Sequence, residues 1–345
     1  MWKCPIKSPA RTLKPLISSE ELWEIALRSS DPTLQDRVLR WAEEAAEAYH
    51  DWWSDVIPHE VVTDAYWDWI RDLLLYPPAA TVKLSDIRMT AAVKPFAGRL
   101  ALVTGGGGGI GEAVCTLLAA EGAIVVVADV QLEATKKVAD SLPGDAKHEA
   151  MHVDVGDSSS VQTLFKGIGD AYSESLSIVV NAAGILRPVP ILECTDELFD
   201  DTIRVNLRGT FLVTREASPY MLRSGVPLHK GGAAVVNIAS IAAKIGSATS
   251  AAYPASKAEV VAFKSAAQEL APHGIRSNVV LPAFTDTSML ANAPPDRIDA
   301  CLSITPLKRI AQAREVAEAI KFLCSPTASS YITGAALEVN GGFYM

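Results

Sequence analysis

The segment AAYPASKAEVV, residues 251–261, places a tyrosine and a lysine four residues apart. Tyr253 and Lys257 would share one face of a helix, because residues at this spacing are neighbours on a helix surface. A phenol is a poor base at neutral pH, since its ordinary pKa is about 10. An ammonium group held about 4 Å away, at an effective dielectric constant of about 20, would stabilise the phenolate by roughly 4 kcal/mol and lower that pKa by about three. The pair therefore predicts a proton-transferring tyrosine, although the same spacing fits an ordinary helix start with Pro254 at its first position.

A glycine-rich turn lies upstream of this pair. TGGGGGIG, residues 104–111, follows an apolar run and opens a segment rich in alanine and leucine. Gly105, Gly109 and Gly111 would let the backbone approach a phosphate, and the helix that begins at Ile110 would direct its positive end at a pyrophosphate. The turn therefore predicts dinucleotide binding. A redox dinucleotide suits a proton-transferring tyrosine, because oxidising a secondary alcohol requires a base for the hydroxyl proton while hydride leaves for nicotinamide.

An acidic residue, Asp129, closes the next apolar run, AIVVVAD, eighteen residues after Gly111. A carboxylate there can accept hydrogen bonds from both ribose hydroxyls of NAD, and it would repel the 2′-phosphate of NADP. An NADP site would have a compensating arginine or lysine, whereas glycines at 106–108 and Val130 occupy those places. We therefore predict that NAD is preferred over NADP. The alternative for Asp129 is a solvated acid at a strand end.

Short apolar runs follow one another from Arg99 onward, most of them separated by helical segments. The runs are rich in valine, isoleucine and alanine, and their hydrophobicity is continuous, which is typical of strands covered on both faces. The predicted fold class is therefore α/β, with a doubly wound parallel sheet whose ligands lie at the carboxyl ends of the strands. The predicted strands are RLALVT, AIVVVAD, HEAMHVD, LSIVVNAAG, AAVVNIAS, IRSNVVLP and GAALEVN.

The N-terminal part has a different composition. All seven tryptophans lie before residue 97, among segments with the apolar stripes of amphipathic helices. We predict an all-helical, Trp-rich extension (residues 1–77), a linker (78–97) and the α/β domain (98–345). The extension could pack on the outside of the α/β domain, cover the substrate loop as a lid, or form part of a subunit interface.

The α/β part of the sequence resembles the short-chain dehydrogenase/reductase family. The glycine turn is similar to the family's T-G-x-x-x-G-x-G motif, and YPASK fits its Y-x-x-x-K motif. NAAG at 181–184, LPAFTDTSM at 281–289 and EVNGG at 338–342 match further family segments in the family's order. The resemblance covers residues 98–345 and leaves 1–97 without a counterpart. It implies a Rossmann-like fold and an NAD(P)-dependent oxidoreductase.

The resemblance also implies catalytic roles for individual residues. Ser240, thirteen residues before Tyr253, would hydrogen-bond the substrate oxygen, and Tyr253 would act as general base or acid. Lys257 would hold the cofactor ribose as well as lower the tyrosine pKa. Asn206, in VNLRGTF, would anchor a water that links Lys257 to solvent. The implied catalytic residues are Asn206, Ser240, Tyr253 and Lys257.

A larger set would bind the cofactor. Asp154 and Val155 would flank the adenine, and Thr287, with the backbone near Thr285, would hold the carboxamide. The implied cofactor-binding residues are Gly105, Gly109, Ile110, Gly111, Asp129, Asp154, Val155, Asn181, Ala182, Gly184, Tyr253, Lys257, Thr285 and Thr287.

Composition argues against several other classes of protein. A net charge of −9, without any run of Lys or Arg, argues against nucleic-acid binding. No apolar stretch reaches the length of a membrane span. Five scattered cysteines and the absence of an apolar signal region in the first nineteen residues favour a cytoplasmic enzyme. The six histidines show no metal-ligand spacing, so we predict no metal site.

The leading hypothesis is an NAD-dependent dehydrogenase acting on a hydrophobic secondary alcohol or ketone. We expect a homo-oligomer, either dimer or tetramer. One alternative is a carbonyl reductase working with NAD(P)H in a biosynthetic pathway, and another is an inactive dinucleotide-binding scaffold. The apolar residues expected around the substrate are Ile185, Leu186, Ile241, Ala242, Ile245, Phe284, Met289 and Leu290.

Overall fold

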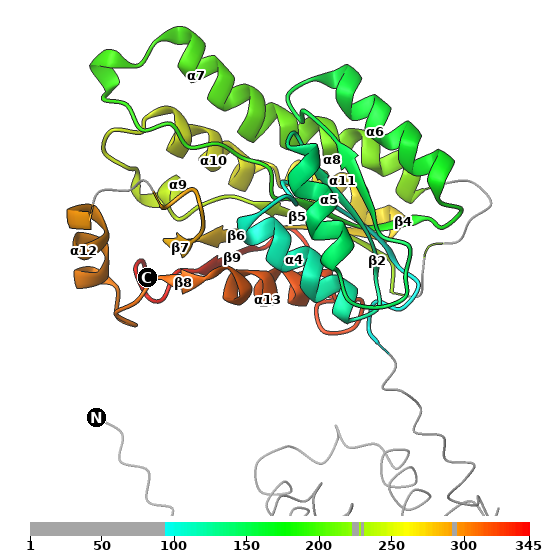
Figure 1. Ribbon diagram of the computed structural model, residues 1–345. Coiled ribbons are helices and arrows are strands. Elements are labelled where there is room, and N and C mark those ends of the chain that lie inside the picture. The colour runs from blue at the N-terminus through cyan, green and yellow to red at the C-terminus, as the bar shows by residue number, and fades with distance from the viewer. Residues whose placement is uncertain (1–93, 223–227, 229–230, 292–294) are drawn as a thin grey trace, which may run out of the picture. The chain divides into compact units, whose positions relative to one another are not determined.

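The computed structural model describes residues 94–222, 228, 231–291 and 295–345 (Figure 1). The predicted extension, residues 1–77, and all but the end of the predicted linker lie outside these ranges. Phe96, near the end of the predicted linker, is 1% exposed and belongs to the same apolar cluster as Leu118. The Phe96 N–H also donates to the Glu121 carbonyl at 3.1 Å. The α/β domain therefore begins before residue 98.

Seven parallel strands form one sheet in the order β3-β2-β1-β4-β5-β6-β9. The central strands β1, β4, β5 and β6 are buried along their whole length, as expected for strands covered on both faces. These observations confirm the predicted doubly wound parallel sheet. The strands are β1 (Leu100–Thr104), β2 (Ile124–Asp129), β3 (Glu149–His152), β4 (Leu176–Asn181), β5 (Ala233–Ile238), β6 (Ile275–Pro282) and β9 (Ala336–Val339).

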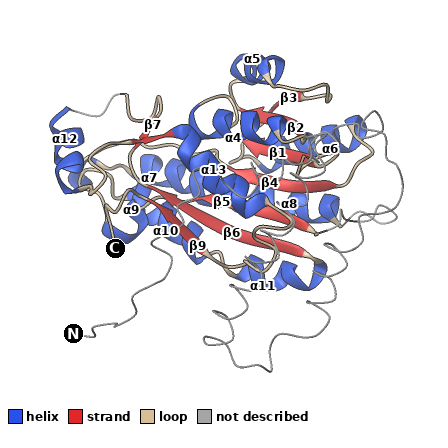
Figure 2. Ribbon diagram, turned by 90° about the horizontal axis from the view of Figure 1, so that it is seen from below, coloured by secondary structure: helices blue, strands red, loops and turns tan. Residues whose placement is uncertain are grey.

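Helices cover both faces of this sheet, and each face has its own cluster of buried apolar residues. Figure 1 shows α4 and α13 on one side and α6, α8, α10 and α11 on the other, and Figure 2 shows α4 and α13 crossing in front of the strands. The helices are α4 (Gly109–Ala120), α5 (Leu132–Ser141), α6 (Ser158–Ala171), α7 (Asp196–Ile203), α8 (Gly209–Met221), α9 (Ala242–Ile245), α10 (Ala252–Ala262), α11 (Ser265–Leu270), α12 (Pro295–Ile304) and α13 (Ala313–Cys324).

Shorter elements connect these helices and strands. They are the 3-10 turns η2 (Ile191–Glu193) and η4 (Ala271–His273), the π-helical turn η3 (Arg204–Arg208), and the paired strands β7 (Thr285–Asp286) and β8 (Ala311–Gln312). No helix among the described residues is long and apolar enough to cross a membrane.

The strand order reverses beside β1. The chain runs from β1 outward to β2 and β3, then returns to β4 on the opposite side of β1. In sheets of this kind, ligands bind in the crevice at the carboxyl ends of the strands that flank such a reversal. The carboxyl ends of β1 and β4 are Thr104 and Asn181, paired in register. The fold thus directs a ligand to the segments that follow these two residues.

Candidate active site

The glycine turn after β1 leaves no room for a side chain at Gly105 or Gly111. Gly105 and Gly109 have φ of 68° and 56°, in the left-handed region that glycine enters without strain. A Cβ on Gly111 would lie 2.0 Å from the Gly105 carbonyl oxygen, and one on Gly105 would lie 2.6 Å from the Ala183 nitrogen. Glycine is therefore required at these positions for the turn and the start of α4 to pack against the end of β4. The resulting cradle at a helix N-terminus fits a pyrophosphate.

Asp129 lies where β2 ends, directly beside this turn. Its carboxylate accepts hydrogen bonds from the Gly107 N–H at 3.3 Å and the Gln131 N–H at 3.0 Å. Asp129 is thus held against the glycine turn and keeps further acceptor capacity, because an ionised carboxylate has about four lone-pair sites. This placement fits the ribose-binding role predicted for Asp129.

Ser240, Tyr253 and Lys257 come together from β5 and α10. The Tyr253 phenol is hydrogen-bonded to the Ser240 hydroxyl. The Lys257 Nζ lies 5.9 Å from the centroid of the Tyr253 ring and donates to the Ile238 carbonyl at 2.8 Å. Lys257 is 5% exposed, so its ammonium group is enclosed beside the tyrosine. The predicted catalytic group is therefore assembled at the carboxyl end of β5.

Burial changes the protonation expected for this pair. It raises the pKa of Tyr253 above its ordinary value, and the hydrogen bond with Ser240 opposes that shift. It also lowers the pKa of Lys257 to about 8. The expectation that Lys257 would bring the tyrosine pKa towards neutrality is thus not met in this structure, because desolvation disfavours the charged forms of both groups.

The helix that carries these residues starts earlier than predicted. α10 begins at Ala252, so Pro254 is its third residue rather than its first. Proline is tolerated there, because the first four N–H groups of a helix have no partner within it. Tyr253 and Lys257 both lie within α10, with the spacing that the sequence predicted.

Asn206 connects the Tyr253 helix to the segment after β4. Its Nδ2 donates to the Ile185 carbonyl at 3.0 Å and to the Ser256 hydroxyl at 3.0 Å, and its Oδ1 accepts from the Ile185 N–H at 2.8 Å. Asn206 is fully buried in η3 rather than in a regular α-helix. π-Helical turns are frequent at functional sites, since they reorient one or two side chains within a helix.

Gly184 lies at the meeting point of the catalytic and cofactor halves. A Cβ on Gly184 would lie 3.2 Å from the Lys257 Nζ and 3.3 Å from the Asn206 Oδ1. On the other side, a Cβ on Gly109 would lie 3.2 Å from the Thr287 side chain. The segments after β1, β4 and β6 therefore converge on one region, as the sequence predicted.

Other predicted cofactor residues serve the fold in this structure. The side-chain amide of the buried Asn181 donates to the Thr214 hydroxyl at 3.1 Å and to the side-chain oxygen of Asn237 at 2.8 Å. Ile110 and Ala182 are partly buried and pack against the core. Thr285 is buried and donates to the Ala283 carbonyl at 3.0 Å. Because these side chains are engaged within the fold, a cofactor would contact these residues through their backbone groups.

The adenine side is organised around an ion pair that the sequence did not reveal. The Asp154 carboxylate accepts from the Arg204 guanidinium at 2.9 and 3.0 Å. Val155 is buried and lies against Gly209, where a Cβ would come within 2.7 Å of it. Asp154 and Val155 thus follow the end of β3 as predicted. The Asp154 carboxylate, however, is already bonded to the Arg204 guanidinium.

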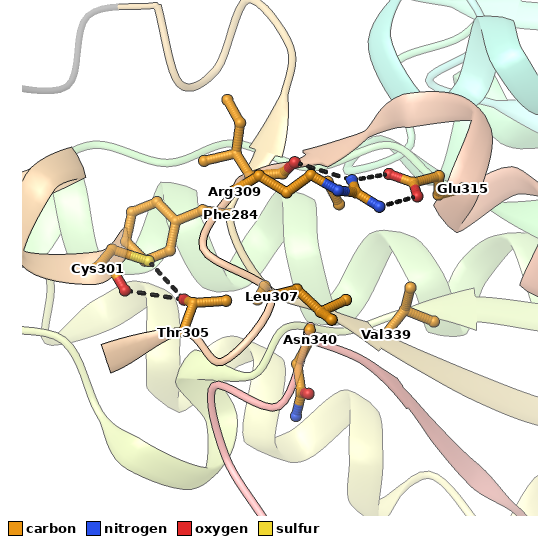
Figure 3. A pocket seen from close by; sticks show the side chains of 12 residues that line it. Phe284, Cys301, Thr305, Leu307, Arg309, Glu315, Val339 and Asn340 are labelled. Atoms are coloured by element: carbon orange, nitrogen blue, oxygen red, sulfur yellow. Dashed lines mark hydrogen bonds and ion pairs between the residues drawn. The ribbon is translucent and has the colours of Figure 1, made fainter. Parts of the chain in front are cut away.

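A cavity of about 90 Å³ is lined by residues of α12, β8 and β9 and of the segments that follow them (Figure 3). Of the apolar residues expected around the substrate, Phe284 lines it and the other seven do not. The Arg309–Glu315 ion pair, with two bonds of 2.6 Å, borders it. It is lined by Ala283, Phe284, Cys301, Thr305, Leu307, Arg309, Ile310, Ala311, Glu315, Val339, Asn340 and Gly341.

Apolar side chains are exposed on the segments that follow β4, β5 and β6. Leu192 is 97% exposed, Ile245 45% and Met289 46%. A bridge between Val189 and Ser250 brings the segment before η2 beside the start of α10. Ile245 and Met289 belong to the predicted substrate surface.

Sequence reasoning missed three polar residues of the site: Ser256, Arg204 and Arg208. Ser256 lies three residues after Tyr253, and its hydroxyl donates to the Tyr253 carbonyl at 2.8 Å. The signal for Ser256 was present, since serine commonly bonds a carbonyl three or four residues earlier in a helix. Arg204 and Arg208 flank Asn206 in RVNLR, but their partners lie about fifty residues away.

Comparison with known proteins agrees with this geometry. Residues 106–344 match the family model described as enoyl-(acyl carrier protein) reductase. The chain is 39% identical over 259 residues to the (3R)-3-hydroxyacyl-CoA dehydrogenase of Canis lupus familiaris, a match that covers 71% of this chain and 96% of that protein. It is 35% identical over 251 residues to the 3-oxoacyl-[acyl-carrier-protein] reductase FabG of Escherichia coli (strain K12), covering 72% and 99%.

A solved structure gives the same result. The short-chain dehydrogenase/reductase SDR:Glucose/ribitol dehydrogenase from Brucella melitensis matches with a TM-score of 0.67 at 32% identity, over 73% of this chain and 98% of that one. The chain therefore belongs to the short-chain dehydrogenase/reductase family, whose members are oxidoreductases that use nicotinamide cofactors.

Proposed function

We propose that this chain is an NAD-dependent oxidoreductase that interconverts an apolar secondary alcohol and its ketone, with Tyr253 as general base or acid. The observation that carries the proposal is the group formed by Ser240, Tyr253 and Lys257 beside the glycine turn. These residues provide a hydroxyl pair for one substrate oxygen and a cation in the same enclosed space. Bound nicotinamide would supply the hydride acceptor or donor.

Each residue has a distinct part in the proposed chemistry. Ser240 donates a hydrogen bond to the substrate oxygen and stabilises the negative charge that develops there. Tyr253 takes the hydroxyl proton during oxidation and returns it during reduction. Lys257, enclosed next to the phenol, holds the cofactor ribose. Asn206 keeps the helix of Tyr253 and the segment at Ile185 at a fixed distance.

The proposed substrate class is supported by apolar side chains that the segments after β4, β5 and β6 expose. Ile245, Met289 and Leu192 expose apolar surface on these segments. Cationic side chains nearby are paired, since Arg187 bonds Asp201 and Lys244 bonds Glu338. An apolar surface with a few polar groups favours an apolar substrate that is fixed by its oxygen. The relatives named as 3-hydroxyacyl-CoA dehydrogenase and 3-oxoacyl reductase make acyl chains with an oxygen on carbon 3 one form of this class.

A substrate panel tests the proposed function. We expect bulky apolar secondary alcohols and 3-hydroxyacyl thioesters to be oxidised with NAD at least about 10-fold more efficiently in kcat/KM than lactate or malate, because each methylene in an apolar site contributes about 1–3 kcal/mol. Initial rates of NADH formation, followed by absorbance, measure this directly. Faster turnover of the charged hydroxy acids would contradict the substrate class, and no turnover of any alcohol or ketone would contradict the activity.

The preference for NAD depends on Asp129. In the Asp129→Ser variant we expect kcat/KM to fall about 10-fold with NAD and to rise at least about 10-fold with NADP. The loss reflects hydrogen bonds to a charged group, about 1.5–3 kcal/mol each, and the gain reflects removal of repulsion against the 2′-phosphate. Steady-state kinetics with each cofactor and one common substrate provide the measurement.

A matched control separates the local carboxylate from net charge. Asp140→Ser, on the exposed face of α5, removes the same charge away from the glycine turn and should change neither value. If the wild type already prefers NADP, or if Asp129→Ser leaves the ratio of the two cofactors unchanged, Asp129 does not select NAD.

The second candidate is a carbonyl reductase that works in the opposite direction on the same site. It is supported by the match to proteins named as reductases and by the raised pKa of Tyr253, which keeps the phenol protonated and ready to donate at neutral pH. Initial rates in both directions at pH 7 distinguish the two. Reduction faster than oxidation under matched saturation would favour this candidate without altering the roles of the residues.

A further inference from the structure

The π-helical turn η3 concentrates polar contacts between the two halves of the site. It joins α7 to α8 and carries Arg204, Asn206 and Arg208 within five residues. The two arginines contact the loop after β3, and the asparagine contacts the segment after β4 and the helix α10. One short turn thus touches both the adenine side and the catalytic side.

On the adenine side, η3 holds the loop at 154–156 at several points. The Arg204 Nη1 donates to both oxygens of Asp154, at 3.0 and 2.9 Å, and Arg208 donates to the Gly156 carbonyl. The Gly156 N–H in turn donates to Asp154 at 2.9 Å. A Cβ on Gly156 would lie 2.1 Å from the Arg204 Nη1, so the guanidinium lies directly over this loop.

On the catalytic side, a continuous chain of hydrogen bonds leads from η3 to Tyr253. The Asn206 Nδ2 donates to the Ser256 hydroxyl at 3.0 Å, and that hydroxyl donates to the Tyr253 carbonyl at 2.8 Å. The Asn206 amide also pairs with both backbone groups of Ile185. A movement of η3 therefore displaces the backbone of Tyr253 and the segment at Ile185 together.

A second branch of the same network reaches the substrate segment. The Arg204 Nε and Nη2 donate to Asp201 at 3.0 and 2.9 Å, and Asp201 also bonds Arg187. Arg187 follows Ile185 by two residues. Arg204 thus connects Asp154 to the segment beside α10 through charged groups, independently of the Asn206 route.

We propose that Arg204 and Arg208 are positioning residues through which occupation of the adenine side, at Asp154–Gly156, orders the helix that carries Tyr253. The proposal rests on the proposed function only in taking the loop at 154–156 as the adenine side. A ligand that restrains this loop restrains η3, and η3 restrains α10 through Asn206. Two sites joined in this way stabilise each other's ordered state.

Hydrogen–deuterium exchange on the full-length chain tests the proposal, with 5′-AMP as a probe that fills the adenine side and carries no nicotinamide. In the wild type, saturating AMP should slow amide exchange at 153–157 and also, by at least about 5-fold, at 252–258 and 185–189. In Arg204→Met, AMP at a concentration that saturates this variant should protect 153–157 and lose the distant protection. Arg204→Lys should restore part of it.

Controls make each outcome decisive. Arg314→Met removes an arginine that is 76% exposed on α13 and should keep the wild-type pattern. If Arg204→Met does not fold, judged by far-UV circular dichroism, Arg208→Met carries the same expectation. Distant protection that persists in the folded arginine variants, or that never occurs in a wild type that binds AMP, overturns the coupling alone. A wild type that binds neither AMP nor NADH overturns the dinucleotide site itself.

Discussion

Replacing Tyr253 with phenylalanine should lower kcat by at least about 10³-fold, since general acid–base catalysis contributes about 10²–10⁴-fold and no neighbouring group replaces the phenol. The substitution removes the hydroxyl that is bonded to Ser240 and keeps the ring beside Lys257. NADH affinity should stay within about 2-fold of the wild type, because the glycine turn and Asp129 are unchanged. The measurements are single-substrate kinetics and NADH titration by fluorescence.

A matched tyrosine elsewhere provides the control for this variant. Tyr172 is buried, donates to the Lys147 carbonyl at 3.0 Å, and lies between α6 and the start of β4 at the amino end of the sheet, away from the site. Tyr172→Phe should therefore lose one hydrogen bond and keep full turnover. If Tyr253→Phe also keeps its turnover, Tyr253 is not the general base or acid of this chain. A Tyr253→Phe variant that no longer binds NADH would show a structural rather than a chemical role.

The sheet was predictable because its strands are nearly all apolar. Runs such as IVVVAD and LSIVVN leave no polar face for solvent, so they require cover on both sides, and the structure places them in a parallel sheet. The limits of the domain were less predictable. Phe96 packs in the core from within a segment whose composition is that of a linker, and only its partners around α4 reveal this.

The positions of the site residues could be predicted, and their protonation could not. Gly105, Asp129 and Ser240 end or follow strands that run in parallel, so their convergence follows from the fold class. The pKa of Tyr253 depends on how much water the fold removes, which no local spacing records. The sequence therefore predicted that Lys257 would lower the pKa of Tyr253, and it missed the burial that raises this pKa.

The long-range contacts of η3 could not be predicted from the sequence. Arg204 pairs with a carboxylate fifty residues earlier in the chain, and Arg208 bonds a carbonyl fifty-two residues earlier. Nothing local marks these pairings, because an arginine in a helix usually lies on a solvated face. The extra residue of the π-helical turn is also invisible in the pattern, although it decides that Asn206 contacts Ile185 and Ser256.

Replacing Lys257 with methionine should raise the free energy of unfolding at pH 7 by about 2 kcal/mol while it abolishes turnover. Burial lowers the pKa of Lys257 from 10.5 to about 8, so keeping the amine protonated in the fold costs roughly 3 kcal/mol. The hydrogen bond from Nζ to the Ile238 carbonyl offsets about 1 kcal/mol of that cost. Methionine has a similar length and no charge, so it recovers the difference. Proteins commonly sacrifice stability at a functional site in this way.

The gain in the free energy of unfolding of Lys257→Met should fall as the pH rises above 8. The folded pKa is depressed, so the penalty is fully present below pH 8 and is relieved as pH rises towards 10.5, where the unfolded chain also loses the proton. The advantage of Lys257→Met over the wild type should therefore be constant below pH 8 and disappear by about pH 10.5.

Urea unfolding must be followed by far-UV circular dichroism, because all seven tryptophans lie before residue 97. Lys166→Met, on the exposed face of α6, should show no such window. A Lys257→Met variant that is less stable than the wild type at pH 7, or whose advantage is the same at pH 7 and pH 10.5, would mean that the buried cation carries no desolvation cost in this fold.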